Sequence, residues 1–239
     1  KTLFPYTTLF RSFFNAQLAT PVLFATILLY TYLKAAPRFV VCLLALSSTL
    51  MFAIWSPLAL IPLTLAAMAL VANRKVLFSS RGWSLVALVV ALLQLVAYVA
   101  FFVLPGYLSL SGLLVAGGGV YDFNKIILVG LIAIVIAGAL LLLPKLSAAL
   151  TSVCFGVAGA ILLGQGFLLV LNREQPQLWT YYPLKFLWLG SVVLLPLAIG
   201  IVLLACVKIN RTLWWQVATF CLVAVGVVGF LNWSPLSVA

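Results

Sequence analysis

The chain has 239 residues, of which 67% are hydrophobic and only 6% are charged. Soluble domains carry about a quarter charged residues, so this composition excludes a soluble fold. The net charge of +11 would suggest nucleic-acid binding in a soluble protein, but here the basic residues stand at the ends of apolar runs. Basic residues in that position set membrane topology, so the expected partner is the lipid bilayer and not nucleic acid.

The first twelve residues, KTLFPYTTLFRS, differ in character from the rest of the chain. Residues 2–12 resemble the in-frame translation of a common short-read sequencing adapter at every position. We therefore set residues 1–12 aside as an artefact and expect the natural sequence to begin near Phe13, with upstream spans missing. Residues 13–239 are expected to form a single transmembrane domain that is a fragment of a larger protein.

Continuous apolar runs separated by short polar joints predict an all-α, polytopic membrane helix bundle. The runs do not alternate between apolar and polar residues, which favours helices over strands. One run contains Gly156, Ala160 and Gly164, a small-residue repeat that is typical of closely packed membrane helices. Eight transmembrane helices are predicted, at residues 18–33, 39–54, 58–72, 83–104, 126–143, 146–171, 186–207 and 213–231.

Charge is divided unequally between the two sides of this predicted bundle. Alternate joints place eight cations and no acid on one side, and three cations with both acids on the other. The positive-inside rule makes the first side cytoplasmic, in a plasma (inner) membrane. Residues 105–124 and 172–185 then face outward. The first of these segments is rich in glycine and still apolar, which favours a re-entrant or interfacial segment.

The predicted spans contain few charged or polar side chains. No Asp, Glu, Lys or Arg falls in the middle of a predicted span, which argues against an ion-coupled carrier. Gln94 and Gln165 are the most polar side chains there, and we expect each to bond a neighbouring helix. Trp55 precedes Ser56 and Pro57, a pattern typical of an interfacial tryptophan followed by a helix-breaking proline.

Neither a metal site nor a cofactor is expected. The chain has no histidine and only two acidic residues, and its cysteines form no C-x-x-C pair. Structural and catalytic zinc sites need three or four such ligands. The cysteines all stand in apolar runs, where they act as small hydrophobic residues: Cys42, Cys154, Cys206 and Cys221.

The segment of residues 172–185, NREQPQLWTYYPLK, is the strongest candidate site. Arg173 and Lys185 supply cations at the membrane boundary, and Tyr181 and Tyr182 supply hydroxyl donors beside them. Such groups can hold a lipid-borne phosphate. The alternative is an interfacial aromatic belt with cations that extend to water.

The Tyr-Tyr-Pro-x-Lys sequence at residues 181–185 resembles motifs in GT-C glycosyltransferases, polytopic enzymes that take sugar from a polyprenyl-phosphate donor outside the membrane. The resemblance covers Tyr181, Tyr182 and Lys185, and it implies that these residues help to hold the donor phosphate. In that family the acidic catalytic residue lies in the first outward loop, and this chain shows no counterpart. The resemblance therefore implies a donor-side element without its catalytic acid.

The only acidic residues, Asp122 and Glu174, are the candidate carboxylate bases. For each, a solvated or paired surface acid is the alternative, and Glu174 can pair with Arg173. Two other functions stay open beside the transferase. One is a transporter or flippase component, which predicts polar groups around a cavity at mid-membrane depth, and the other is a non-catalytic scaffold subunit.

Overall fold

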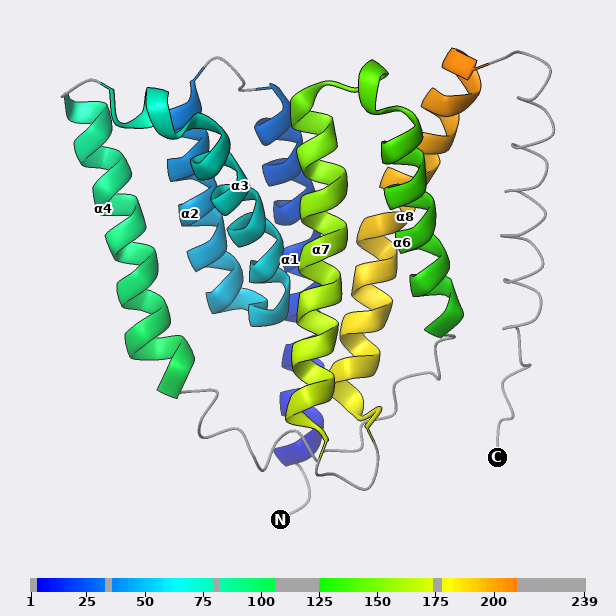
Figure 1. Ribbon diagram of the computed structural model, residues 1–239. Coiled ribbons are helices and arrows are strands. Elements are labelled where there is room, and N and C mark those ends of the chain that lie inside the picture. The colour runs from blue at the N-terminus through cyan, green and yellow to red at the C-terminus, as the bar shows by residue number, and fades with distance from the viewer. Residues whose placement is uncertain (1–3, 33–35, 80–81, 106–124, 174–177, 210–239) are drawn as a thin grey trace.

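The computed structural model describes residues 4–32, 36–79, 82–105, 125–173 and 178–209, and within these ranges all regular structure is helical (Figure 1). The predicted all-α class is confirmed for this part of the chain. Three short elements extend or join the main helices: η1 (Ser56–Ala59), the π-helical η2 (Val99–Val103) and η4 (Leu143–Lys145). The main helices are α1 (Phe4–Tyr32), α2 (Pro37–Trp55), α3 (Leu60–Leu77), α4 (Trp83–Tyr98), α6 (Lys125–Leu141), α7 (Ala148–Leu171) and α8 (Tyr181–Ile209).

Among the described residues, five helices are long and apolar enough to cross a membrane, so the predicted count of eight is corrected. The predicted runs at 18–33 and 126–143 correspond to Leu18–Tyr32 and Lys125–Leu141, apolar helices shorter than the roughly 20 residues that a span needs. The predicted span at 213–231 lies outside the described residues. The five candidates are Pro37–Trp55, Pro57–Leu77, Trp83–Val103, Ala148–Leu171 and Tyr182–Ala205. The chain is therefore an integral, multi-pass membrane protein.

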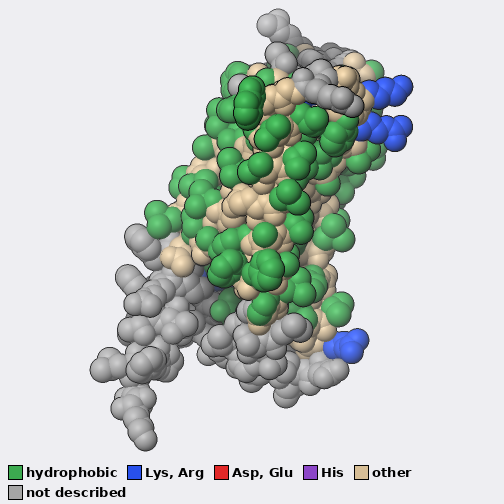
Figure 2. Space-filling view, turned by 90° about the vertical axis from the view of Figure 1, so that its left-hand side faces the viewer, with side chains coloured by type: hydrophobic (Ala, Val, Ile, Leu, Met, Phe, Trp, Pro, Cys, Tyr) green, Lys and Arg blue, Asp and Glu red, His purple; other side chains and the backbone are tan. Residues whose placement is uncertain are grey.

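The helices run between two ends of the bundle, named here after one residue at each (Figure 1). At the Arg38 end α1, α3 and α6 finish and α2, α4 and α7 begin, whereas at the Lys185 end α7 finishes and α6 and α8 begin. The α2–α3 connection stops short of the lower tips of α1 and α7. Figure 2 shows basic side chains only near the two ends of an otherwise apolar face, as a membrane-spanning bundle requires.

Small residues let α7 pack closely against its neighbours. A Cβ atom at Gly156 would come within 2.7 Å of Leu65 Cδ2 on α3. A Cβ atom at Gly164 would come within 2.7 Å of Phe186 Cζ on α8 and 3.0 Å of Leu60 Cδ1 on α3. The predicted packing role of these glycines is confirmed, since no larger residue fits without a shift of its neighbours.

Hydroxyl side chains inside the helices mostly bond the backbone one turn earlier. Ser48 donates to Leu44 O at 2.7 Å, and Ser191 donates to Leu187 O at 2.9 Å. Thr26 shares this pattern, and its Oγ1 also bonds Ser47 Oγ at 3.1 Å between α1 and α2. Such bonds satisfy polar groups that lipid tails cannot hydrogen-bond. An unpartnered polar atom therefore stands out against this background.

Arg38 ties the start of α2 to the α3–α4 joint. Its Nε donates to Leu77 O at 2.9 Å, and its Nη1 donates to Ser84 Oγ at 2.6 Å. We expect Arg38→Met to cost about 1–3 kcal/mol of unfolding free energy, because both acceptors lose a charged donor. Thermal unfolding in nanodiscs measures this cost. The exposed Lys75 supplies the control, and equal stability of Arg38→Met and Lys75→Met would contradict the role of Arg38.

Candidate functional site

The predicted outward segment at 172–185 is partly helical. Helix α8 begins at Tyr181, so Tyr181, Tyr182 and Lys185 belong to it, and the predicted span start at residue 186 is wrong. Pro183 is the physical reason, because a proline in the first turn of a helix lacks only an N–H that has no helical partner there. The backbone N–H of Leu184 already bonds Thr180 O at 3.2 Å. This shift moves Lys185 from a loop into the bundle.

Lys185 is buried, with only 3% of its surface exposed. Its Nζ lies 5.4 Å from the centre of the Trp55 ring, a cation–π geometry that joins α8 to the end of α2. The Trp55 ring in turn lies 6.0 Å from the Phe186 ring, and both rings are buried. A lysine that extends to water keeps its ammonium exposed, and Lys185 instead has most of its surface covered by the bundle.

Gln165 joins α7 to α8 at another position around the α8 axis. Its Nε2 donates to Pro183 O at 3.3 Å, which confirms the interhelical bond expected for this side chain. Its Oε1 is buried and has no hydrogen-bond partner among the described residues. This bond fixes α7 to the first turn of α8, two residues before Lys185. Gln94, by contrast, is exposed on α4.

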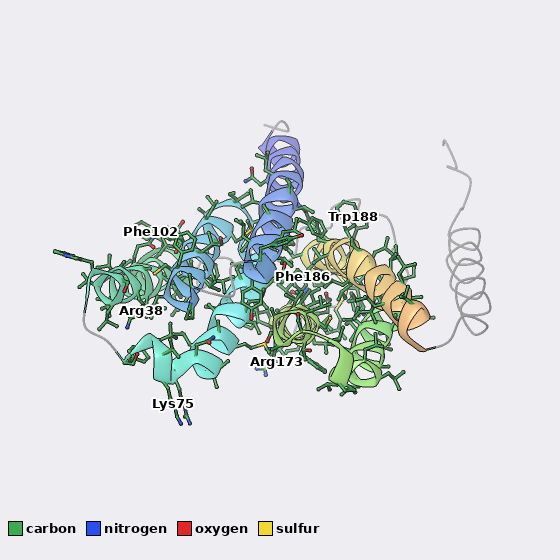
Figure 3. The ribbon with its side chains drawn as sticks, turned by 90° about the horizontal axis from the view of Figure 1, so that it is seen from above. Arg38, Lys75, Phe102, Arg173, Phe186 and Trp188 are labelled. Carbon is green, nitrogen blue, oxygen red and sulfur yellow. The ribbon has the colours of Figure 1, made fainter. Side chains whose placement is uncertain are left out.

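Among the other predicted site residues, the structure describes the side chains of Arg173 and Tyr182. Arg173 is exposed just beyond α7, on the side of that helix away from Phe186 (Figure 3). Tyr182 is half-buried and packs against the hydrophobic core. The contact that the structure shows at Lys185 is with Trp55, so it joins α8 to α2. Three candidates lie outside the described structure: the Tyr181 side chain, Asp122 and Glu174.

Lys125 is a second lysine at this end of the bundle. Its Nζ lies 4.7 Å from the centre of the Trp179 ring, just before α8. Lys125 is exposed, whereas Trp179 is half-buried against the core. The two lysines therefore share one type of contact and differ in burial, which makes Lys125 a natural control for Lys185.

Asn172 holds the end of α7 to the segment that enters α8. It is fully buried, and its Nδ2 donates to Leu178 O at 3.2 Å and to Thr180 Oγ1 at 2.6 Å. Its Oδ1 is buried with no partner in the described part of the chain. The two bonds fix the residues that precede the first turn of α8, and so the height at which Lys185 enters the bundle.

Asn172→Ala should loosen this connection. We expect a loss of about 1–3 kcal/mol in local stability, because the hydroxyl of the half-buried Thr180 and the Leu178 carbonyl lose their donor. Hydrogen exchange at residues 178–180 should become faster, as read by mass spectrometry. Asn73→Ala is the matched control, since Asn73 Nδ2 bonds only Ala69 O, within its own helix. Equal exchange at 178–180 in both variants would mean that Asn172 does not hold this connection.

Sequence reasoning missed the part that Trp55 plays. The pattern before Pro57 predicted an interfacial residue, yet Trp55 is only 5% exposed and lies against α8. One signal was present in the sequence. Only Ser56 and Pro57 separate two apolar runs there, and so short and uncharged a joint need not reach the membrane surface.

The described site offers hydrogen-bond donors and no carboxylate. Lys185 and Trp55 have only N–H groups to present, which suits a ligand with negatively charged oxygens. No group of three or more His, Cys, Asp or Glu side chains that could hold a metal is present in the described ranges. Comparisons with known protein families, with curated proteins and with solved structures find no match to this chain.

Proposed function

We propose that this chain binds the phosphate of a polyprenyl-phosphate lipid at the extracytoplasmic face of the membrane, as the donor-binding element of a GT-C-like glycosyltransferase. The observation that carries the proposal is the buried ammonium of Lys185, 3% exposed within the candidate span Tyr182–Ala205. Charge interactions are stronger in such a low-dielectric site than in water. A buried lysine is therefore a strong attractor for an anionic headgroup.

The surroundings of the site favour an anion carried on a lipid. The Lys185 ammonium lies over the aromatic ring of Trp55, and the ring of Phe186 packs against that of Trp55. The neighbouring helix α7 also exposes large apolar side chains, including Phe167 and Val170, in its last two turns. The bundle thus offers apolar helix surface to a polyprenyl tail in the bilayer, while the phosphate suits the lysine.

The distribution of basic residues supports an extracytoplasmic position for the Lys185 end. Outside residues 1–12, five described basic residues lie at the Arg38 end and three at the Lys185 end, and by the positive-inside rule this favours the cytoplasm for the Arg38 end: Arg38, Arg74, Lys75, Lys145 and Lys208 against Lys125, Arg173 and Lys185. The Lys185 end then faces outward, where GT-C enzymes use their polyprenyl-phosphate donors. The resemblance of residues 181–185 to that family points to the same ligand. The proposal concerns donor binding alone, because both acidic residues lie outside the described structure.

The test compares a polyprenyl phosphate with the matching polyprenol, which lacks the phosphate. The full chain in nanodiscs is titrated with each lipid, and bound lipid is counted by native mass spectrometry. We expect at least a tenfold preference for the phosphate, since hydrogen bonds to charged groups contribute about 1.5–3 kcal/mol. Equal retention of the two lipids would contradict phosphate binding and favour the scaffold subunit. Leaflet exchange of the phosphate lipid without preferential binding would favour the flippase component.

A further inference from the structure

The indole N–H of Trp55 is a buried donor without an acceptor. Trp55 ends α2 and is only 5% exposed, and its Nε1 has no hydrogen-bond partner among the described residues. Buried polar groups are nearly always bonded, and each exception calls for an explanation. Hydroxyl groups such as those of Ser48 and Ser191 reach a carbonyl one turn away, but an indole N–H has no such local acceptor.

The position of this N–H links it to Lys185. The Lys185 ammonium lies 5.4 Å from the centre of the Trp55 ring, and Phe186 packs on the same ring. Two buried donors from distant parts of the sequence thus stand side by side. The cation lies over the ring, whereas the N–H points outward in the ring plane, so neither group can satisfy the other. The indole N–H therefore still calls for an acceptor atom.

The turn between α2 and α3 sets the depth of Trp55. Gly164 of α7 faces Leu60, at the start of α3, and α7 continues to Leu171. Seven residues of helix correspond to about 10 Å, so the turn lies that far inside the tip of α7. Figure 1 shows the same offset between the α2–α3 connection and the lower end of α7. An acceptor for Trp55 must therefore reach into the bundle.

We propose that Trp55 is a second ligand-binding residue of the lysine site, and that its indole N–H donates a hydrogen bond to an oxygen of the lipid phosphate whose charge Lys185 neutralises. The inference rests on the proposed function and adds the α2–α3 turn to the binding site. A phosphate presents several acceptor oxygens around one centre, so it can serve both donors at once. The flexible four-carbon stem of lysine lets the ammonium move from the ring towards an oxygen.

The test removes the N–H and keeps the ring. Trp55→Phe retains an aromatic face for Lys185 and lacks the donor, and we expect its affinity for a polyprenyl phosphate to fall about tenfold or more. Trp179→Phe is the matched control, because Trp179 also lies under a lysine but its Nε1 is not among the buried unpartnered atoms. The control should bind like the unmodified chain. Polyprenol should show no such difference, and free inorganic phosphate should not compete if the lipid is the source of the phosphate.

A near-isosteric replacement covers the case in which Trp55→Phe does not fold. Site-specific incorporation of benzothienylalanine at position 55 replaces the ring N–H by sulfur and preserves the shape of the side chain. The same fall in affinity is expected for it. Unchanged affinity in a folded Trp55 variant, with binding lost in Lys185→Met, would overturn the role of Trp55 and leave the phosphate site standing. Unchanged binding in Lys185→Met would overturn the proposed function itself.

Discussion

Lys185→Met should abolish the preference for polyprenyl phosphate over polyprenol and leave the bundle folded. Methionine has a similar length and no charge, so the ligand loses its main electrostatic partner, at a cost of at least tenfold in affinity. The protein loses a buried charge, and replacing such a charge by an apolar side chain of similar volume is often neutral or stabilising. The expected signature is therefore lost binding together with an unchanged or higher unfolding temperature.

The control for this prediction is Lys125→Met, at the same end of the bundle. Lys125 is exposed and lies over Trp179, so its removal changes the net charge by the same amount outside the buried site. The preference of the Lys125→Met variant for polyprenyl phosphate over polyprenol should stay close to that of the unmodified chain. An equal loss in both variants would mean that general attraction to the membrane end, and not the buried ammonium, holds the phosphate.

Gly164→Leu should be strongly destabilising. A Cβ atom at this position already meets Phe186 Cζ at 2.7 Å and Phe186 Cε1 at 2.8 Å, and that ring is fully buried. Overpacking of a filled core costs about 1–3 kcal/mol, and we expect a value near the upper limit because the ring in the way is fully buried. The displaced ring lies against Trp55, so phosphate binding should weaken as well.

Gly166→Leu is the matched control on the same helix. A Cβ atom there meets nothing within 4 Å, so a larger side chain points into open space. Replacing this helical glycine should leave the free energy of unfolding unchanged or raise it by about 1 kcal/mol, because glycine has a low helix propensity. Thermal unfolding of both variants in the same nanodiscs compares them directly. Similar stability of the two variants would contradict the close packing of α7 on α8.

The helical class and several boundaries follow from the sequence because membrane helices depend on local composition. The predicted run at 39–54 appears as α2, Pro37–Trp55, and the run at 146–171 appears as α7, Ala148–Leu171. In both cases an apolar run is bounded by proline or a basic residue, which marks the joint directly. The role of the glycines at 156 and 164 was also visible, as a four-residue repeat.

The content of the site was less predictable because it depends on tertiary contacts. Lys185 looked like a boundary cation, since the sequence does not show that α8 begins at Tyr181 and turns Lys185 towards α2. Trp55 looked interfacial, since its burial depends on α8 packing against a turn more than a hundred residues away in the sequence. Arg173 is close to Lys185 in the sequence but lies across α7 from Phe186 (Figure 3). Closeness in the sequence does not reveal this separation.

The most direct test of the account is a distance measurement between the lipid phosphate and the Lys185 ammonium. The full chain is labelled with ¹⁵N at the lysine side chains, reconstituted with a polyprenyl phosphate, and studied by solid-state ³¹P–¹⁵N dipolar recoupling. We predict a short-range phosphate–ammonium contact that persists in Lys125→Met and disappears in Lys185→Met. A contact that survives in Lys185→Met, or that disappears only in Lys125→Met, would contradict a phosphate site at the buried lysine.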